Sequence, residues 1–553
     1  MSLRPDPIGP VPDETARVAQ AAFPHGTAWM RLRDVLGPIY EDATFAPLFS
    51  QRGRPAEAPW RLALVSVMQF AERLSDRKAA DAVRGRIDWK YALGLPLDDP
   101  GFDASVLCEF RARLLAGSAE QHLLDTLLTI CRTRGWLHAR GRQRTDSTHV
   151  LAAIRAHNRV EAVRETVRHT LNVLAEQVPE WLLQHVQPDW AERYRSGWDD
   201  TRLPSKQAER DALVAQVGAD GLALLQAALA DDAPLGLRSI PAIELLRQVW
   251  VQNYLPTDDG LRWRTNDDGL PPASRFISSP YDPEAHLALK RATAWVGYKV
   301  HLTETCEPET PNLITDVQTV VAPLADWDSL PVIHQGLAER DLLPSQHLVD
   351  SGYVDAALLV ASRRDFGIDL VGPPRGDQHW QAREQTGFSA EYFHIDWEQQ
   401  RATCPEGRTS VSWSPAVDNQ RTEVIKIRFS EKDCSRCPSV TRCVRSSKKY
   451  PRRLITVRRQ AAYEALRAAR QREKTRAFAE LYAIRSGMEG TISQGVRRCG
   501  MRRTRYRGLA KTHLDHVLTA TALNCLRLSE WLAGAPKATT QHSRFARLLA
   551  FGS

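Results

Sequence analysis

Five short stretches rich in β-branched residues alternate with helical segments, and this alternation constrains the fold more than any other feature. The five stretches are residues 144–154, 293–305, 312–323, 346–354 and 368–374. A helical pattern lies between the third and the fourth stretch, and another follows the fourth. Strands interleaved with helices in this way predict a mixed α/β fold, with one mixed sheet and flanking helices.

The wide spacing of these stretches predicts two insertions into the α/β core. A long helical segment separates the first stretch from the second, and short strands with turns follow the last one. Helical periodicity also fills the region before the first stretch. The expected domains are a flexible arm (1–30), a helical DNA-binding domain (31–140), three core pieces (141–160, 286–374 and 458–535), a helical insertion (161–285), a β-rich insertion (375–457) and a tail (536–553).

The N-terminal helical domain permits two interpretations. Ser75 is a suitable N-cap for a short helix that follows the apolar helix of residues 59–74. The pair is either part of a plain helical bundle or a DNA reader similar to a helix-turn-helix. In the second case four basic residues would face the DNA: Arg77, Lys78, Arg84 and Arg86.

Positive charge is concentrated near the C-terminus. The 553-residue chain has a formal net charge of +8, but residues 441–510 alone contain 20 Lys and Arg against 4 Glu and no Asp. So few compensating acids favour a phosphate-bearing partner over a solvated helix face. We expect no membrane span and no signal peptide, because the apolar runs are short and the N-terminus is Pro-rich. Nine cysteines, an odd number, suit a reducing cytoplasm.

Four of the cysteines form a cluster in the β-rich insertion. Cys434, Cys437 and Cys443 have the spacing C-x2-C-x5-C, and Cys404 precedes them in a CPEG turn. Four thiolates can close a tetrahedral Zn²⁺ site in a region with little apolar core. The alternative is a set of ordinary half-buried cysteines. The spacing favours zinc.

Three acidic residues stand out by their context. Asp146 lies within the first strand, Asp350 ends the strand HLVD before a Ser-Gly turn, and Glu489 is the only acid among seven arginines in residues 482–507. Each alone could be a structural carboxylate, and Glu489 could simply pair with Arg485. Together they supply three hard oxygen ligands, which suit Mg²⁺ or Mn²⁺. Other acids of the core are interpreted as turn or capping residues: Asp316, Asp326, Asp328 and Asp355.

The motifs around these acids resemble a known family. DST at Asp146, VDSGY at Asp350 and Y-x2-R-x3-E at Tyr482, Arg485 and Glu489 are similar to the motifs of DDE transposases of bacterial insertion sequences. The resemblance is to the group with a YREK signature and a β-rich insertion before the catalytic glutamate. It extends from about residue 59 through the last predicted helix.

The resemblance implies an RNase H-like core with a two-metal site for cutting and rejoining DNA. Asp146, Asp350 and Glu489 would be the catalytic metal ligands, while Tyr482 and Arg485 would hold DNA phosphates. The signature lysine is replaced by Val496. Further backbone contacts are expected from Arg497, Arg498, Arg502, Arg503, Arg505 and Lys511.

The implied partners are the terminal inverted repeats of the element and a target DNA, bound by a homodimer. The implied location is the nucleoid in a bacterial cytoplasm. Three alternatives remain: a domesticated DNA-binding protein that does not cut, an RNase H-like nuclease acting on RNA or junctions, and a zinc-dependent transcription regulator. The three acids argue against a protein that only binds, and the long helical front end favours transposition.

Overall fold

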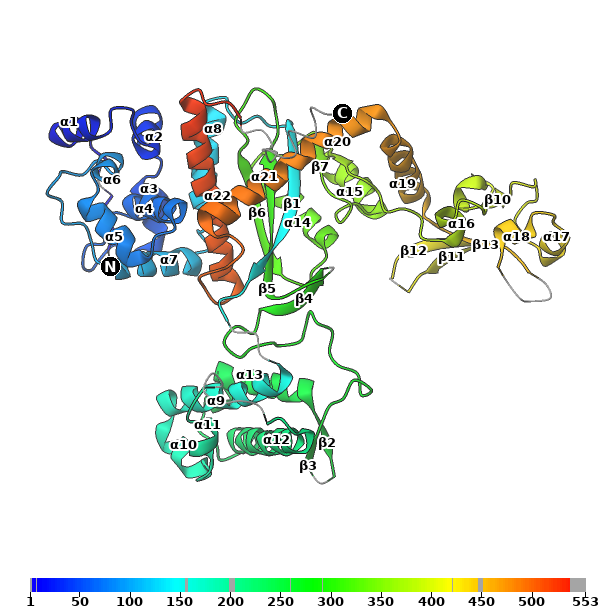
Figure 1. The fold of residues 1–553 in the computed structure, drawn as a ribbon, viewed down its shortest axis with the longest axis horizontal. Coiled ribbons are helices and arrows are strands. Elements are labelled where there is room, and N and C mark those ends of the chain that lie inside the picture. The colour runs from blue at the N-terminus through cyan, green and yellow to red at the C-terminus, as the bar shows by residue number, and fades with distance from the viewer. Residues whose placement is uncertain are drawn as a thin grey trace.

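A six-stranded mixed sheet forms the centre of the molecule in the computed structural model (Figure 1). The structure describes residues 2–5, 7–154, 158–197, 204–258, 260–290, 292–419, 421–445 and 451–537. The central strand β1 pairs antiparallel with β5 and parallel with β7, and β7 continues in parallel to β8. Both β4 and β6 pair antiparallel with β5. The strands are β1 (Arg142–Leu151), β4 (His286–Lys290), β5 (Thr293–Thr305), β6 (Ile314–Val321), β7 (Gln346–Leu348) and β8 (Asp369–Val371).

The flanking helices occupy the segments that the sequence predicts. Helix α14 (Asp326–Glu339) follows β6, and α15 (Ala356–Phe366) connects β7 to β8. The last helix, α22 (Leu509–Leu532), is fixed to the sheet by Asn524, whose side chain exchanges two hydrogen bonds of 2.8 Å with the backbone of Ile314. The mixed sheet with flanking helices is thereby confirmed.

The N-terminal helices pack on α22 and share one apolar core with the sheet. Figure 1 shows α22 standing between these helices and the sheet. As predicted, Ser75 caps α5, and its side chain accepts a hydrogen bond from the backbone of Lys78. The helices are α1 (Asp13–Ala22), α2 (Ala28–Leu36), α3 (Asp42–Phe45), α4 (Pro59–Glu72), α5 (Asp76–Gly85), α6 (Ile87–Ala92), α7 (Ser105–Ala116) and α8 (His122–Thr133).

The expected flexible arm over residues 1–30 is wrong for most of that range. Helix α1 packs through Ala19 against Met30 and Tyr91. The Thr15 hydroxyl is buried and donates a hydrogen bond of 2.8 Å to the Leu95 carbonyl. These contacts offset the entropy cost of ordering a short helix that is weak in isolation. The expected tail falls largely on residues 538–553, outside the described part of the chain.

A separate helical unit with its own apolar core lies between β1 and β4. It also carries a hairpin of β2 (Tyr254–Thr257) and β3 (Gly260–Trp263). By length and composition α12 is long and apolar enough to cross a membrane, but its buried face packs within this core, as in a globular protein. The helices are α9 (Arg159–Gln177), α10 (Pro179–His185), α11 (Trp190–Tyr194), α12 (Gln207–Leu229) and α13 (Pro241–Asn253).

The β-rich region projects beyond α19 and contains a third apolar cluster (Figure 1). A three-stranded sheet in the order β11-β12-β13 and a two-stranded sheet of β9 and β10 form it. Its strands are β9 (His394–Asp396), β10 (Arg401–Thr403), β11 (Ser412–Val417), β12 (Glu423–Arg428) and β13 (Leu454–Arg458). Its helices are α16 (Trp380–Arg383), α17 (Glu431–Ser435) and α18 (Val440–Cys443).

The Arg-rich segment before α22 is a series of short helices. Helix α19 (Gln460–Glu473) ends where Thr475 caps α20 (Arg476–Ala483) by accepting a hydrogen bond from Phe478. A 3-10 turn (Ile484–Ser486) then leads into α21 (Gly487–Gln494) and a π turn (Gly495–Cys499). The segment passes beside β1, the central strand of the sheet, which α21 contacts (Figure 1).

Candidate active site

Asp146 and Asp350 lie on neighbouring parallel strands. Asp146 is in the middle of β1, and its Oδ1 accepts a hydrogen bond of 2.8 Å from the backbone of Ser147. Asp350 follows the end of β7, and its Oδ1 accepts a hydrogen bond of 2.7 Å from the backbone of Gly352. Because β1 pairs with β7, these two segments are held on one side of the molecule.

Arg485 connects Asp146 to Glu489. Its Nη2 lies 2.5 Å from Asp146 Oδ2, and its Nη1 lies 3.6 Å from Glu489 Oε1. The side chains of Asp146 and Arg485 are each 14% exposed, whereas that of Glu489 is 71% exposed. Tyr482, one turn earlier, is half-buried and stacks on Phe478. The segment that carries Y-x2-R-x3-E therefore reaches the strand that carries Asp146.

The electrostatics of the site centre on Arg485. Burial raises the pKa of Asp146 to about 6, although Arg485 and the Ser147 backbone act in the opposite direction. Burial alone would lower the pKa of Arg485, but Asp146, Tyr482, Asp350 and Glu489 outweigh it and raise that pKa. Asp146, Asp350 and Glu489 thus all stabilise the positive charge of Arg485.

The donor set has the chemistry of a magnesium site. Three carboxylates offer hard oxygen ligands, and Asp146 and Glu489 already share one cation in Arg485. In the described part of the chain, no three acidic, histidine or cysteine side chains lie close enough together to hold a metal ion. Arg485 is the counter-charge that Asp146 and Glu489 share.

A fourth carboxylate, Asp326, lies beside the site, and its interpretation as a turn or capping residue was incomplete. A Cβ atom placed on Gly352 would lie 2.9 Å from a carboxylate oxygen of both Asp326 and Asp350. Asp326 also accepts a hydrogen bond of 3.1 Å from Ser147 and pairs with Lys299 at 2.9 Å. Its position at the start of the first helix after β6 is the sequence signal that could have identified it.

Two other predicted turn or capping residues have defined roles in the structure. Asp355 caps α15 as expected, since it accepts a hydrogen bond from Ala357. Asp316 is not a turn residue: it lies fully buried on β6 and pairs with Arg340 at 2.8 Å. Asp316 and Asp355 thus have structural partners of their own.

A buried ion-pair network holds the site segments together, and the sequence analysis missed it. Glu304 on β5 is fully buried and pairs with Arg144 at 2.6 Å and with Arg527 at 2.8 Å. Thr491 of α21 donates a hydrogen bond of 2.6 Å to Glu304, and Arg144 donates one of 2.5 Å to the Ile484 carbonyl. Because Arg144 is two residues from Asp146 and Thr491 two from Glu489, the network connects both catalytic candidates.

The basic residues after Glu489 are exposed, as a DNA-binding surface requires. Two of them also have structural contacts: Arg502 donates a hydrogen bond to Thr148, and Arg505 donates one to the Leu74 carbonyl. Val496 packs against the main apolar core, so its side chain is a packing group. The exposed residues are Arg497, Arg498, Arg502, Arg503, Arg505 and Lys511.

The basic residues of α5 are only partly available for DNA. Arg77 and Lys78 are exposed. Arg84 pairs with Asp81 at 3.1 Å, and Arg86 is held by ion pairs with Glu72 and Asp88. The expectation that all four face DNA is therefore weakened for Arg86, whose guanidinium is neutralised within the domain.

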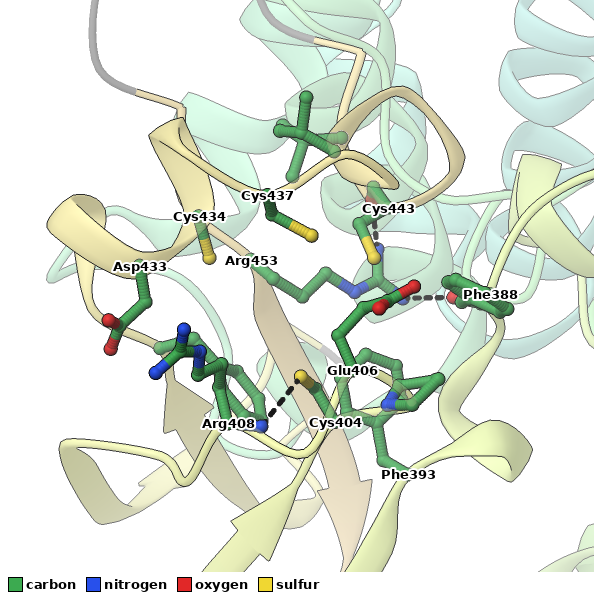
Figure 2. A pocket seen from close by; sticks show the side chains of 14 residues that line it. Phe388, Phe393, Cys404, Glu406, Arg408, Asp433, Cys434, Cys437, Cys443 and Arg453 are labelled. Atoms are coloured by element: carbon green, nitrogen blue, oxygen red, sulfur yellow. Dashed lines mark hydrogen bonds between the residues drawn. The ribbon is translucent and has the colours of Figure 1, made fainter.

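The four clustered cysteines border one small cavity in the β-rich region (Figure 2). They are free thiols of intermediate exposure. The remaining cysteines are dispersed, and most are buried: Cys108, Cys131, Cys306, Cys499 and Cys525. The predicted cluster is therefore brought together in space, in the β-rich region, which Figure 1 shows away from the central sheet.

Comparison with protein families gives two matches. Residues 403–529 match the transposase DDE domain, and residues 17–113 match a transposase domain (DUF772). The first match includes Glu489 and the four clustered cysteines, whereas Asp146 and Asp350 lie outside both. No curated protein and no solved structure matches the chain. Residues 17–113 and 403–529 are thus similar to two transposase domains, and these matches indicate transposase activity, an enzymatic phosphoryl transfer.

Proposed function

We propose that this transposase cuts and rejoins DNA at the ends of a bacterial insertion sequence, with Asp146, Asp350 and Glu489 as its catalytic residues. The observation that carries the proposal is that Arg485 pairs with both Asp146 and Glu489, while Asp350, from a third part of the chain, also raises the pKa of its guanidinium. The strand order β6-β5-β1-β7-β8, with three antiparallel strands followed by two parallel ones, supports an RNase H-like core.

Asp146, Asp350 and Glu489 would hold Mg²⁺ or Mn²⁺ through their carboxylate oxygens. When bound, such ions activate an attacking water or 3′-hydroxyl and stabilise the leaving oxygen of an in-line displacement. The Gly352 backbone N–H orients Asp350, and Lys299 lowers the pKa of the nearby Asp326, which keeps that carboxylate charged.

Arg485 would hold the DNA phosphate at the cleaved end. A guanidinium group can bind a phosphate by two parallel hydrogen bonds, and Arg485 already holds one carboxylate, Asp146, by a hydrogen bond. An arriving phosphodiester would take Arg485 from Asp146 and release that carboxylate for the metal. Tyr482, on the same side of the segment, would make a second contact to the DNA backbone.

The exposed arginines that follow Glu489 would bind the DNA backbone without reading its sequence. The N-terminal helical domain would recognise the terminal inverted repeats. We further propose that two protomers bridge two element ends as a homodimer, in the nucleoid of a bacterial cytoplasm. If the arginines bind the backbone and the N-terminal domain recognises the repeats, the protein should bind any DNA duplex with a salt-dependent affinity. It should bind duplexes that contain the element ends more tightly.

The test is a cleavage assay on DNA that carries the inverted repeats flanking the gene. With Mg²⁺ or Mn²⁺ we expect strand cleavage that Asp146→Asn and Glu489→Gln abolish, while both variants keep their affinity for DNA. Glu480→Gln, an exposed acid of α20 paired with Arg476, is the matched control and should cut normally. Tight binding without cleavage by the unmodified protein would instead identify a domesticated DNA-binding protein.

A further inference from the structure

The cavity in the β-rich region is bordered by cysteines from three separate segments. Cys404 begins the turn after β10, Cys434 belongs to α17 with Cys437 in the loop after it, and Cys443 ends α18. The cavity has a volume of about 30 Å³, which is room for a single ion or water molecule. Figure 2 shows the four thiols distributed around it.

The two helices that carry Cys434 and Cys443 have no apolar core of their own. Helix α17 has five residues and α18 has four, and neither contains a buried residue. Helices this short are unstable in isolation. A cross-link through their thiols would supply stability that apolar burial does not, as in small zinc domains.

Cationic and donor groups around the cavity suit thiolates. The Arg408 backbone donates a hydrogen bond of 3.3 Å to Cys404 Sγ. The Arg453 guanidinium borders the cavity and donates a hydrogen bond of 2.8 Å to the Cys443 carbonyl. Its Nε is buried without a hydrogen-bond partner. A site of four thiolates and one Zn²⁺ has a net charge of −2, which a nearby guanidinium offsets.

We propose that Cys404, Cys434, Cys437 and Cys443 bind one structural Zn²⁺, separate from the carboxylates that serve DNA cleavage. The thiols stand further apart than in a closed site, since no three such side chains in the described residues lie within metal-binding range. Closure requires sulfur atoms roughly 3.8 Å apart, around an ion about 2.3 Å from each. Side-chain rotation of the cysteines in the turn and the two short helices would provide this movement.

The first experiment measures metal in the full-length protein. After purification and dialysis into metal-free buffer, elemental analysis should find about one zinc per chain. Replacement of this zinc by Co²⁺ should produce the thiolate-to-cobalt charge-transfer absorption that oxygen ligands do not give. A protein that contains no zinc, and that shows no such absorption when Co²⁺ is added, would overturn the proposal.

Variants then identify the ligands. Cys434→Ser and Cys437→Ser should each lower the zinc content to below about a tenth of the original, whereas Cys108→Ser, at an exposed cysteine of α7, should leave it unchanged. Zinc retained by both cluster variants would refute the assignment. Asp146→Asn should keep its zinc while losing cleavage, so that a failure here is distinguishable from a failure of the proposed catalytic site.

Discussion

Loss of the charge on Glu304 should destabilise β1 and α21, the segments that carry Asp146 and Glu489. Glu304→Gln preserves the size of the side chain but leaves Arg144 and Arg527, whose side chains are 7% and 14% exposed, without their common counter-charge. Breaking a buried ion pair from one side costs about 3–5 kcal/mol. At tenfold for each 1.4 kcal/mol, even the lower figure corresponds to roughly 100-fold more frequent opening.

Hydrogen exchange measured by mass spectrometry reports this opening segment by segment. We expect peptides from β1 and α21 to exchange roughly 100-fold faster in Glu304→Gln, while peptides from α9 and α13, which pack in a separate core, keep their rates. The matched control is Glu244→Gln, which removes an exposed ion pair with Arg247. Exposed pairs contribute about 0–1 kcal/mol, so this variant should change little.

Two results would refute this reasoning. If β1 and α21 in Glu304→Gln exchange within a factor of about three of the unmodified rate, the network contributes little to holding the site. If acceleration is equal in all regions, the cause is global destabilisation, and Glu304 has no special connection to the catalytic segments.

Three further predictions follow from the same region. Burial favours the neutral form of Glu304, but Arg527 and Arg144 outweigh it and lower its pKa below the ordinary 4.5. The stabilisation from its charge is therefore complete above pH 4.5 and is lost as the pH falls through the lowered pKa. Acid unfolding of the unmodified protein should for this reason be steeper than that of Glu304→Gln. Gly487→Ala places a Cβ 2.1 Å from Arg144 Nη1 and should cost about 1–3 kcal/mol in chemical denaturation. Gly490→Ala meets open space and should be neutral or stabilising by up to about 1 kcal/mol. Arg485→Lys should reduce cleavage about 10- to 100-fold in the DNA assay, because an ammonium group cannot replace the guanidinium's paired hydrogen bonds, and unchanged cleavage would exclude the proposed phosphate contact.

The sequence predicted the elements of the core because their signals are local. Apolar alternation predicts the strands of the sheet, and helical periodicity predicts the helices that flank it. The residues next to Ser75 are enough to predict that it caps a helix. Asp146, Asp350 and Glu489 were selected because each stands in an unusual local context. All three raise the pKa of Arg485, and their catalytic role stays a prediction.

The sequence did not reveal features that depend on tertiary contacts. Glu304 lies in an ordinary strand pattern, and its two arginine partners are 160 and 223 residues away. Asp326 resembles a routine helix-start residue in the sequence, and only the fold brings it and Asp350 to the same residue, Gly352. Helix α1 is not evident from the sequence, because a short segment after a Pro-rich start is ordered by tertiary contacts with Met30, Tyr91 and Leu95.

The central claim is that Asp146, Asp350 and Glu489 share bound metal, and iron-directed cleavage of the protein tests it directly. Fe²⁺ replaces Mg²⁺ at oxygen-ligand sites and, with a reductant and peroxide, generates hydroxyl radicals that cut the nearest backbone. The account predicts cuts close to residues 146, 350 and 489, suppressed by excess Mg²⁺ and lost in Asp146→Asn. Cuts confined to other regions, or cuts near only one of the three residues, would contradict it.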